Sequence, residues 1–306
     1  MPVRWRRFKN FSGPLVTPDN PVSIKTPVMD ASDHWSRAFW LTSMVESGGR
    51  AGLVNMYDGC GATCGLHQAI AVLPRSMKAQ GSLWKLLWRM TSVIPLTYYR
   101  LSELIAEAGW VLTGNGIVHP SDAPVDPRLI RDTLTPIEGN VPKSGERWEQ
   151  AAMWGECFSE VFALLPGIEV QMNFGIEHFH ASARRLKHNG QRLSTLIYNA
   201  AAHDQYPFLL GSVDLAVSMF WSQYVNGPSP ARRALWKAYD KTGGPWGGYP
   251  TKFAIALIRN LGNNTYGRWD DDIPGGRYQR TREHAMKVWP KGLFGEDGVM
   301  PLDLLD

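Results

Sequence analysis

Two carboxylates and a hydroxyl lie close together in one glycine-rich stretch of the sequence. Glu46 ends an apolar run, Asp58 follows twelve residues later on a glycine-rich turn, and Thr63 comes five residues after that. Cleavage of a glycosidic bond needs one carboxylic acid that stays protonated and a second that stays ionised. Glu46 follows the apolar Met44 and Val45, so we expect it to be a desolvated proton donor. Asp58 lies among glycines, so we expect it to be the more solvated carboxylate, and Thr63 could hold the attacking water by a hydrogen bond.

A helix and a small hairpin are predicted to position these three residues. Apolar residues at helical spacing between Trp35 and Val45 predict a helix that ends at residues 47–49, Ser-Gly-Gly. Residues 50–66 are glycine-rich with a short apolar run, a pattern typical of a hairpin or loop. We therefore expect the first carboxylate at the end of the helix and the other two groups on the hairpin.

The rest of the chain shows mainly helical patterning, with prolines between the segments. Trp84 and Trp88 are four residues apart on one such segment, and both are expected to face the core. Further helices are predicted at residues 67–73, 82–91, 97–109, 127–134, 144–164, 175–188, 191–201, 212–225, 229–240, 250–261 and 278–287. The sequence therefore predicts a mainly α fold with one short β-hairpin at the candidate site.

The proline content of the first residues separates them from the remainder. Residues 1–29 contain five prolines and few apolar runs, which predicts an extended N-terminal arm. Residues 30–306 are predicted to form a single domain, with a weaker candidate boundary in the proline-rich stretch 114–142. The basic residues of the arm are interleaved with aromatic ones, so the arm could dock on an acidic surface, but an arm packed along the body of the protein is favoured.

The composition excludes several classes of protein. The chain has 306 residues, of which 44% are hydrophobic and 20% charged, so it can bury a core and is not disordered. Three cysteines are too few for a disulfide framework. The net charge of +4 is mild and does not demand nucleic acid. We expect no membrane span, and no secretory signal, because no apolar stretch follows the basic start.

A resemblance to a known family rests on the stretch from Asp58 to Gln68. It reads Asp-Gly-Cys-Gly-Ala-Thr-Cys-Gly and continues with Leu-His-Gln. Preceded by Glu46, it resembles the active-site signature of the lysozyme superfamily, especially the phage-type lysozymes and the related chitosanases. A second stretch, residues 218–235, resembles a helix pair of helical muramidases. The likeness implies a lysozyme-like helical domain in which Glu46 is the general acid, Asp58 the base or an electrostatic partner, and Thr63 the water holder.

The resemblance also implies a substrate and a biological setting. The expected activity is a muramidase that cuts the β-1,4 links of peptidoglycan glycan strands with inversion and without a cofactor. A phage endolysin in the host cytoplasm before lysis, or a virion-associated enzyme, would reach the wall without a signal peptide. In a virion, residues 1–29 could contact other virion or tail proteins. Residues expected to contact the sugars are Tyr57, His67, Gln68, Asn226, Trp246 and Tyr249.

Other interpretations stay open at this point. The chain could be a non-catalytic structural or wall-binding virion protein on the same frame, a chitosanase, or a lytic transglycosylase. Cys60, Cys64 and His67 have spacing that zinc tolerates, but no second paired set follows, so buried thiols and no metal are favoured. Cys157 lacks the local signature of a nucleophile. A metalloprotease is not supported, since His-Glu-x-x-His is missing from the sequence.

Overall fold

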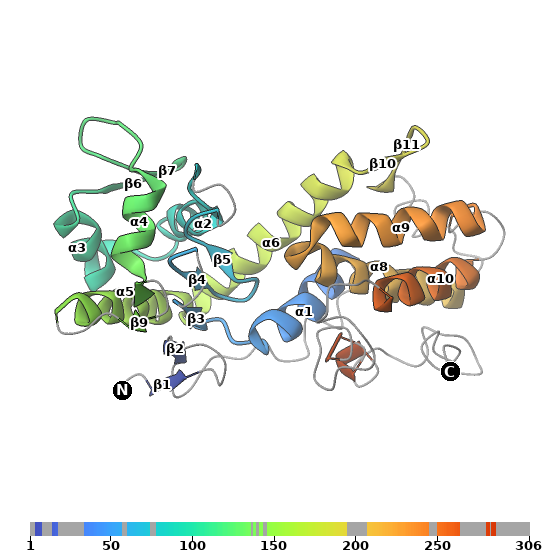
Figure 1. Cartoon of the computed structure of the whole chain (residues 1–306), viewed down its shortest axis with the longest axis horizontal. Helices are drawn as coiled ribbons and strands as arrows, with labels where there is room; N and C mark the ends of the chain where they lie inside the picture. The colour runs from blue at the N-terminus through green and yellow to red at the C-terminus, as the bar shows by residue number, and fades with distance from the viewer. Residues whose placement is uncertain are drawn as a thin grey trace. The chain divides into compact units, whose positions relative to one another are not determined.

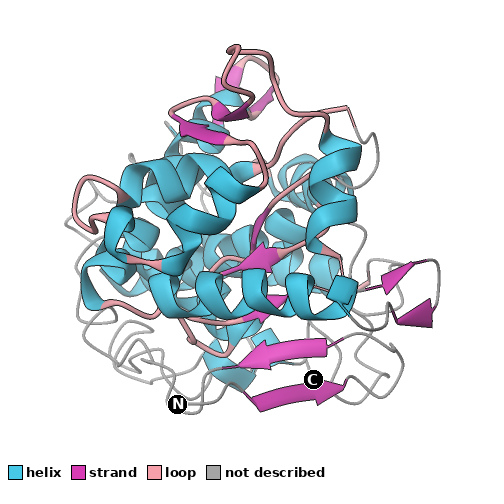
Figure 2. Cartoon of the chain, turned by 90° about the vertical axis from the view of Figure 1, so that its left-hand side faces the viewer, coloured by secondary structure: helices cyan, strands magenta, loops and turns pink. Residues whose placement is uncertain are grey.

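The structure is a computed structural model that describes part of the chain. The described residues are 4–7, 14–17, 34–56, 60–73, 78–135, 137–138, 141–142, 146–194, 207–244, 250–263, 280–281 and 283–285. They are mainly helical with small antiparallel sheets, which confirms the predicted mainly α class (Figures 1 and 2).

The chain divides into two compact units where the sequence predicts one domain over residues 30–306. Unit 1 comprises Met1–Ile24 and Glu46–Phe174, and unit 2 comprises Lys25–Val45 and Gly175–Asp306. The proline-rich stretch 114–142 lies inside unit 1 and marks no boundary.

The sheet of unit 1 contains five short antiparallel strands, each paired with its neighbour in sequence. They are β1 (Arg4–Arg7), β2 (Pro14–Thr17), β3 (Val54–Asn55), β4 (Thr63–Cys64) and β5 (Ala69–Ile70). Strands β3 and β4 confirm the hairpin predicted within residues 50–66.

Strands β1 and β2 place part of the predicted N-terminal arm in the sheet. They pair with each other, and β2 pairs with β3, so this part of residues 1–29 belongs to the sheet of unit 1. Pro14 does not prevent this, because it is the first residue of its strand, a position that tolerates proline. The remainder of residues 1–29 lies outside the described part of the chain.

The alternation of the short strands gives the sheet an apolar and a polar side. Val54 pairs with Cys64, which pairs with Ala69, and all three are buried in the hydrophobic core of unit 1. One position along, Asn55 pairs with Thr63. Because successive side chains point to opposite sides of a strand, the Asn55–Thr63 pair projects from the side opposite the core.

The helices of unit 1 enclose a core rich in aromatic rings. Trp84, Trp110, Trp154 and Phe158 contact one another with ring centroids 5.7 to 6.3 Å apart. Trp88, expected in the core, is instead 45% exposed.

The helical elements of unit 1 are α2 (Ser82–Met90), the 3₁₀ turn η2 (Leu96–Tyr98), α3 (Arg100–Glu107), α4 (Pro127–Leu134) and α5 (Glu146–Phe162). Its small hairpins are β6 (Val111–Thr113) with β7 (Gly116–Val118) and β8 (Ile137–Glu138) with β9 (Val141–Pro142).

Unit 2 is built from long helices. In it α8, α9 and α10 pack against one another, as Figure 1 shows in orange and red. Trp221 stacks on Phe179 and contacts Trp35. The elements are α1 (His34–Ser47, ending in unit 1), α6 (Leu165–Arg185, beginning in unit 1), β10 (Lys187–His188), β11 (Gln191–Arg192), α8 (Pro207–Asn226), α9 (Pro228–Thr242) and α10 (Pro250–Gly262). Residues 191–192 form strand β11, so the helix predicted at 191–201 does not begin at residue 191. Within the described residues, no helix is long and apolar enough to cross a membrane.

Candidate functional site

A hydrogen-bond network on the polar side of the sheet joins three side chains of the glycine-rich stretch. The Oε1 atom of Gln68 accepts a hydrogen bond from Asn55 Nδ2 at 2.5 Å and one from Thr63 Oγ1 at 3.0 Å. The Nε2 atom of Gln68 donates to the carbonyl of Gly65 at 2.9 Å. The structure therefore brings together Thr63 and Gln68, two of the residues that the sequence places in the site.

Gln68 holds this position in a backbone conformation that glycine normally fills. Its φ is 53°, in the left-handed region, and Gly65 three residues earlier has φ 79°. A side chain in this region costs free energy, and it persists where the surrounding contacts determine it. These two residues turn the chain from β4 into β5, where the sequence predicts a helix over residues 67–73. That prediction is wrong. The apolar residues of this stretch have helical spacing, but spacing alone does not indicate that Gln68 adopts a left-handed backbone conformation, which a helix excludes.

Two buried side chains of unit 1 hold the stretch in place, and sequence reasoning missed both. Gln171 on α6 is 3% exposed, accepts a hydrogen bond from Leu66 N at 2.9 Å and donates to the carbonyl of Phe162 at 2.9 Å. Ser159 on α5 donates to the carbonyl of Gly52 at 2.8 Å. In the sequence each of them is a polar residue within a mainly apolar helical segment. That pattern does not indicate which backbone group the side chain bonds to.

Glu46 is the next-to-last residue of α1. Its side chain is half-buried, and the Oε1 atom is enclosed by protein. The helix ends directly after it, because Gly48 and Gly49 adopt left-handed conformations with φ 63° and 71°. The sequence-based expectation that this carboxylate ends a helix next to apolar residues is therefore met in the structure.

For most of the remaining predicted residues the structure describes no side chain. His67 is half-buried on the turn between β4 and β5. Asn226 ends α8 in unit 2, and its side chain lies outside the description. Tyr57, Asp58, Trp246 and Tyr249 lie outside the described residues. The predicted pairing of Glu46 with Asp58 therefore stays a prediction.

The cysteines form no disulfide, and within the described part of the chain they belong to no group of metal ligands. Cys60, Cys64 and Cys157, all three described, are buried thiols without a disulfide. Among the described residues, no three His, Cys, Asp or Glu side chains are grouped as metal ligands. Burial, together with the charges of Glu160 and Glu156, raises the pKa of Cys157 to about 11. This thiol is protonated at neutral pH, and a protonated thiol is a poor nucleophile.

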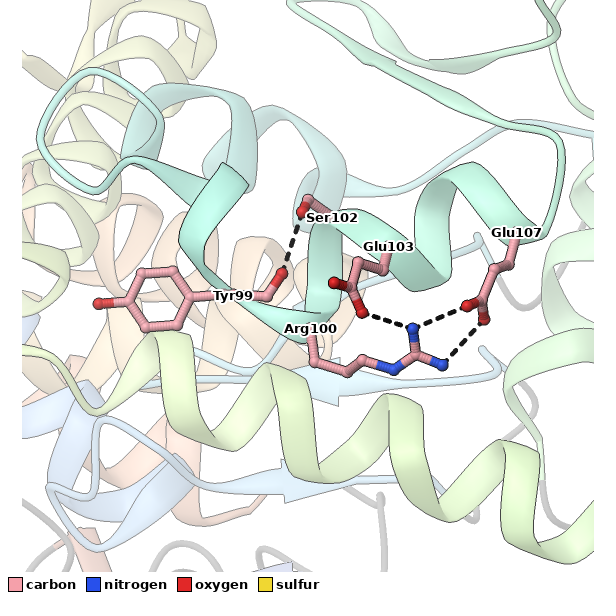
Figure 3. Close-up of polar contacts among 5 residues, drawn as sticks. All are labelled: Tyr99, Arg100, Ser102, Glu103 and Glu107. Atoms are coloured by element: carbon pink, nitrogen blue, oxygen red, sulfur yellow. Dashed lines mark hydrogen bonds and ion pairs between the residues drawn. The ribbon is translucent and has the colours of Figure 1, made fainter.

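A second polar cluster lies on α3 and is exposed. Arg100 bonds to Glu103 at 2.6 Å and to both carboxylate oxygens of Glu107 at 2.7 and 3.0 Å, as Figure 3 shows. The hydroxyl of Ser102 donates to the carbonyl of Tyr99 at the start of the same helix. The hydrogen bonds to Glu107 and Glu103 raise the pKa of Arg100 above its already high value. Exposed ion pairs of this kind contribute little stability.

Comparisons with protein families, with curated proteins and with solved structures give no match to this chain.

Proposed function

We propose that the protein is a lysozyme-like glycoside hydrolase that cleaves β-1,4 linkages in bacterial peptidoglycan. The observation that carries the proposal is the order of the elements that follow Glu46 along the chain. A half-buried carboxylate ends α1, and the chain continues into a small antiparallel sheet whose polar side holds Thr63 and Gln68 in one network. This order of elements, and the residue types on them, suit the acid and the water-holding parts of a glycosidase.

The proposed mechanism is a single displacement. Glu46 donates its proton to the glycosidic oxygen as the bond from that oxygen to the anomeric carbon breaks. A water held by Thr63 attacks the anomeric carbon from the opposite side, and Asp58 takes the proton that this water loses. The products are a sugar with a new hydroxyl on the leaving oxygen and a sugar with inverted configuration at a reducing end. Half-burial beside apolar residues suits Glu46 to the role of proton donor.

The charge of the chain supports an anionic substrate. The net charge of +4 favours association with wall polymers, which carry carboxylates. The aromatic residues Tyr57, Trp246 and Tyr249 would stack on sugar rings, and His67 and Asn226 would contact sugar hydroxyls. Association with other virion proteins through residues 1–29 stays a prediction.

The proposal is tested by clearing of a peptidoglycan suspension. Glu46→Gln keeps the size of the side chain and removes its acidity, so the clearing rate should fall about a hundredfold or more. The melting temperature should change little. Glu156→Gln is the matched control, because Glu156 is an exposed carboxylate on α5 and should clear at the wild-type rate. A Glu46→Gln variant that clears as fast as wild type would contradict the proposed role of Glu46.

A further inference from the structure

We propose that Gln68 is a positioning residue that fixes the hydroxyl of Thr63 as a hydrogen-bond acceptor toward the attacking water. This inference rests on the proposed function and assigns a task to a side chain that would otherwise only contact the substrate. It follows from the directions of the hydrogen bonds between Gly65, Gln68, Asn55 and Thr63.

The carbonyl of Gly65 determines which way the amide of Gln68 points. A carbonyl oxygen only accepts hydrogen bonds, so the amide atom 2.9 Å from it must be the nitrogen, Nε2. The other amide atom, Oε1, therefore faces Asn55 and Thr63. Asn55 Nδ2 donates to this oxygen at 2.5 Å, in agreement with the same orientation.

With Gln68 in this orientation, the hydroxyl of Thr63 acts as the hydrogen-bond donor to its amide oxygen. Its hydroxyl has one proton, and the neighbours that bond to it are two acceptors, Gln68 Oε1 at 3.0 Å and the carbonyl of Asn55 at 3.5 Å. The nearer oxygen takes the proton, so the rest of the Thr63 oxygen presents lone pairs only. A water at this hydroxyl must donate one proton to it. The water then keeps its second proton for transfer to a base and its lone pair for the attack.

The network includes two energetically unfavourable features. Gln68 occupies a left-handed conformation that a glycine would adopt without strain. The Oδ1 atom of Asn55 is buried and has no hydrogen-bond partner among the described residues. Thr63 itself is only 4% exposed, which suits it to hold one ordered water rather than bulk solvent. Strain at Gln68 and an unsatisfied polar atom on its partner Asn55 together support a functional role for the network.

Steady-state kinetics on solubilised peptidoglycan test the positioning role. Gln68→Met removes both amide groups and keeps the chain length, so the Thr63 proton turns toward Asn55 and the water is misdirected. We expect kcat to fall about ten- to a hundredfold with KM within about twofold, since a small misplacement of a reacting group has effects of this size. Gln80→Met is the matched control, because Gln80 bonds the backbone of Ile117 and Val125 in the same unit and should keep the wild-type kcat.

A second pair of variants leaves Gln68 and its turn unchanged. Thr63→Val has nearly the same shape without the hydroxyl, and its kcat should fall about a hundredfold. Thr63→Ser restores the hydroxyl, and its kcat should stay within about threefold of wild type. If Thr63→Val retains the wild-type kcat, the inference is overturned even where Gln68→Met fails to fold.

A spectroscopic measurement separates this inference from the proposed function. In wild-type protein the hydroxyl proton of Thr63 should give a slowly exchanging NMR signal, and Gln68→Met should accelerate its exchange at least tenfold. Equal exchange rates in the two proteins overturn the fixed orientation. A Gln68→Met kcat within twofold of wild type, with Glu46→Gln inactive, overturns the positioning role and leaves the proposed function standing. An inactive wild-type protein overturns the proposed function and the positioning role together, and NMR then decides the orientation alone.

Discussion

Asp214 on α8 accepts hydrogen bonds from Arg37 on α1, with 2.7 Å between Nε and Oδ2 and 3.1 Å between Nη2 and Oδ1. His34, one turn earlier on α1, also bonds to Oδ1. All three side chains are at most 15% exposed. Burial alone would raise the pKa of Asp214, but His34 and Arg37 together outweigh it and hold this pKa below its ordinary value. The cluster therefore fixes the first turn of α1 on α8 within unit 2.

Removal of the Asp214 charge should destabilise the protein strongly. Asp214→Asn removes the carboxylate that the buried side chains of Arg37 and His34 contact, so the free energy of unfolding at pH 7 should fall by about 3–5 kcal/mol. Urea denaturation followed by circular dichroism measures this loss. Asp240→Asn is the control, because Asp240 is 64% exposed and bonds to His188, so its removal should cost less than about 1 kcal/mol. Equal losses in the two variants would contradict the account of the buried cluster.

The same carboxylate predicts a pH dependence of stability. Its pKa is lower in the folded than in the unfolded state, so its contribution is complete above the unfolded value, about 3.9. The contribution is lost as the pH falls through the lower folded value. Wild-type stability should therefore decline more steeply than that of Asp214→Asn below about pH 4. If the free energy of unfolding falls equally in the two proteins below pH 4, a group other than Asp214 controls the loss of stability in acid.

Cys157 should resist alkylation in the folded protein. With its pKa near 11, only a small fraction of the thiol is ionised at pH 8, and the side chain is also buried. Iodoacetamide should modify it at least tenfold more slowly in native protein than in urea. Peptide mass mapping distinguishes it from Cys60 and Cys64. Rapid modification of Cys157 in native protein at pH 8 would show an accessible thiolate and restore it as a candidate nucleophile.

Gly65 should tolerate no side chain. An added Cβ would lie 2.3 Å from Gln171 Oε1 and 2.6 Å from Phe162 Cδ1, and φ is 79°. Gly65→Ala should therefore lower the free energy of unfolding by about 2–5 kcal/mol, the sum of backbone strain and overpacking. Gly109→Ala shares the left-handed backbone, at φ 71°, but meets nothing within 4 Å, so it should lose only about 1–2 kcal/mol. Thermal unfolding compares the two, and equal losses would exclude the predicted clash.

Local patterns predicted most of the helices, and the reasons are visible at single residues. Helix α4 matches the predicted 127–134, because Pro127 starts it and Asp126 caps it by accepting from Arg128 N at 2.8 Å. Glu46 lies at its predicted helix end for a similar reason, the glycine pair that follows. Features that depend on residues next to one another in sequence were therefore predictable.

Features that depend on distant residues were not. Strand β1 becomes part of a sheet only through pairing with β2, and nothing near Arg4 indicates that partner. Gln171 holds the turn at Leu66 from 105 positions away, so its role has no local pattern. At the site, the types and spacing of Glu46 and Thr63 indicated glycosidic bond cleavage. The hydrogen bonds around Gln68 could be recognised only from the three-dimensional structure.

Analysis of the muropeptides released from purified peptidoglycan tests the central claim most directly. We expect soluble products with new reducing ends, identified by borohydride reduction and mass spectrometry, from wild-type protein and not from Glu46→Gln. Hydrolysis adds one water to each cleaved bond, so each new end should carry that mass. Wall that stays undigested by folded wild-type protein, or products with 1,6-anhydro ends and no added water, would contradict the assignment of this chain as a hydrolase.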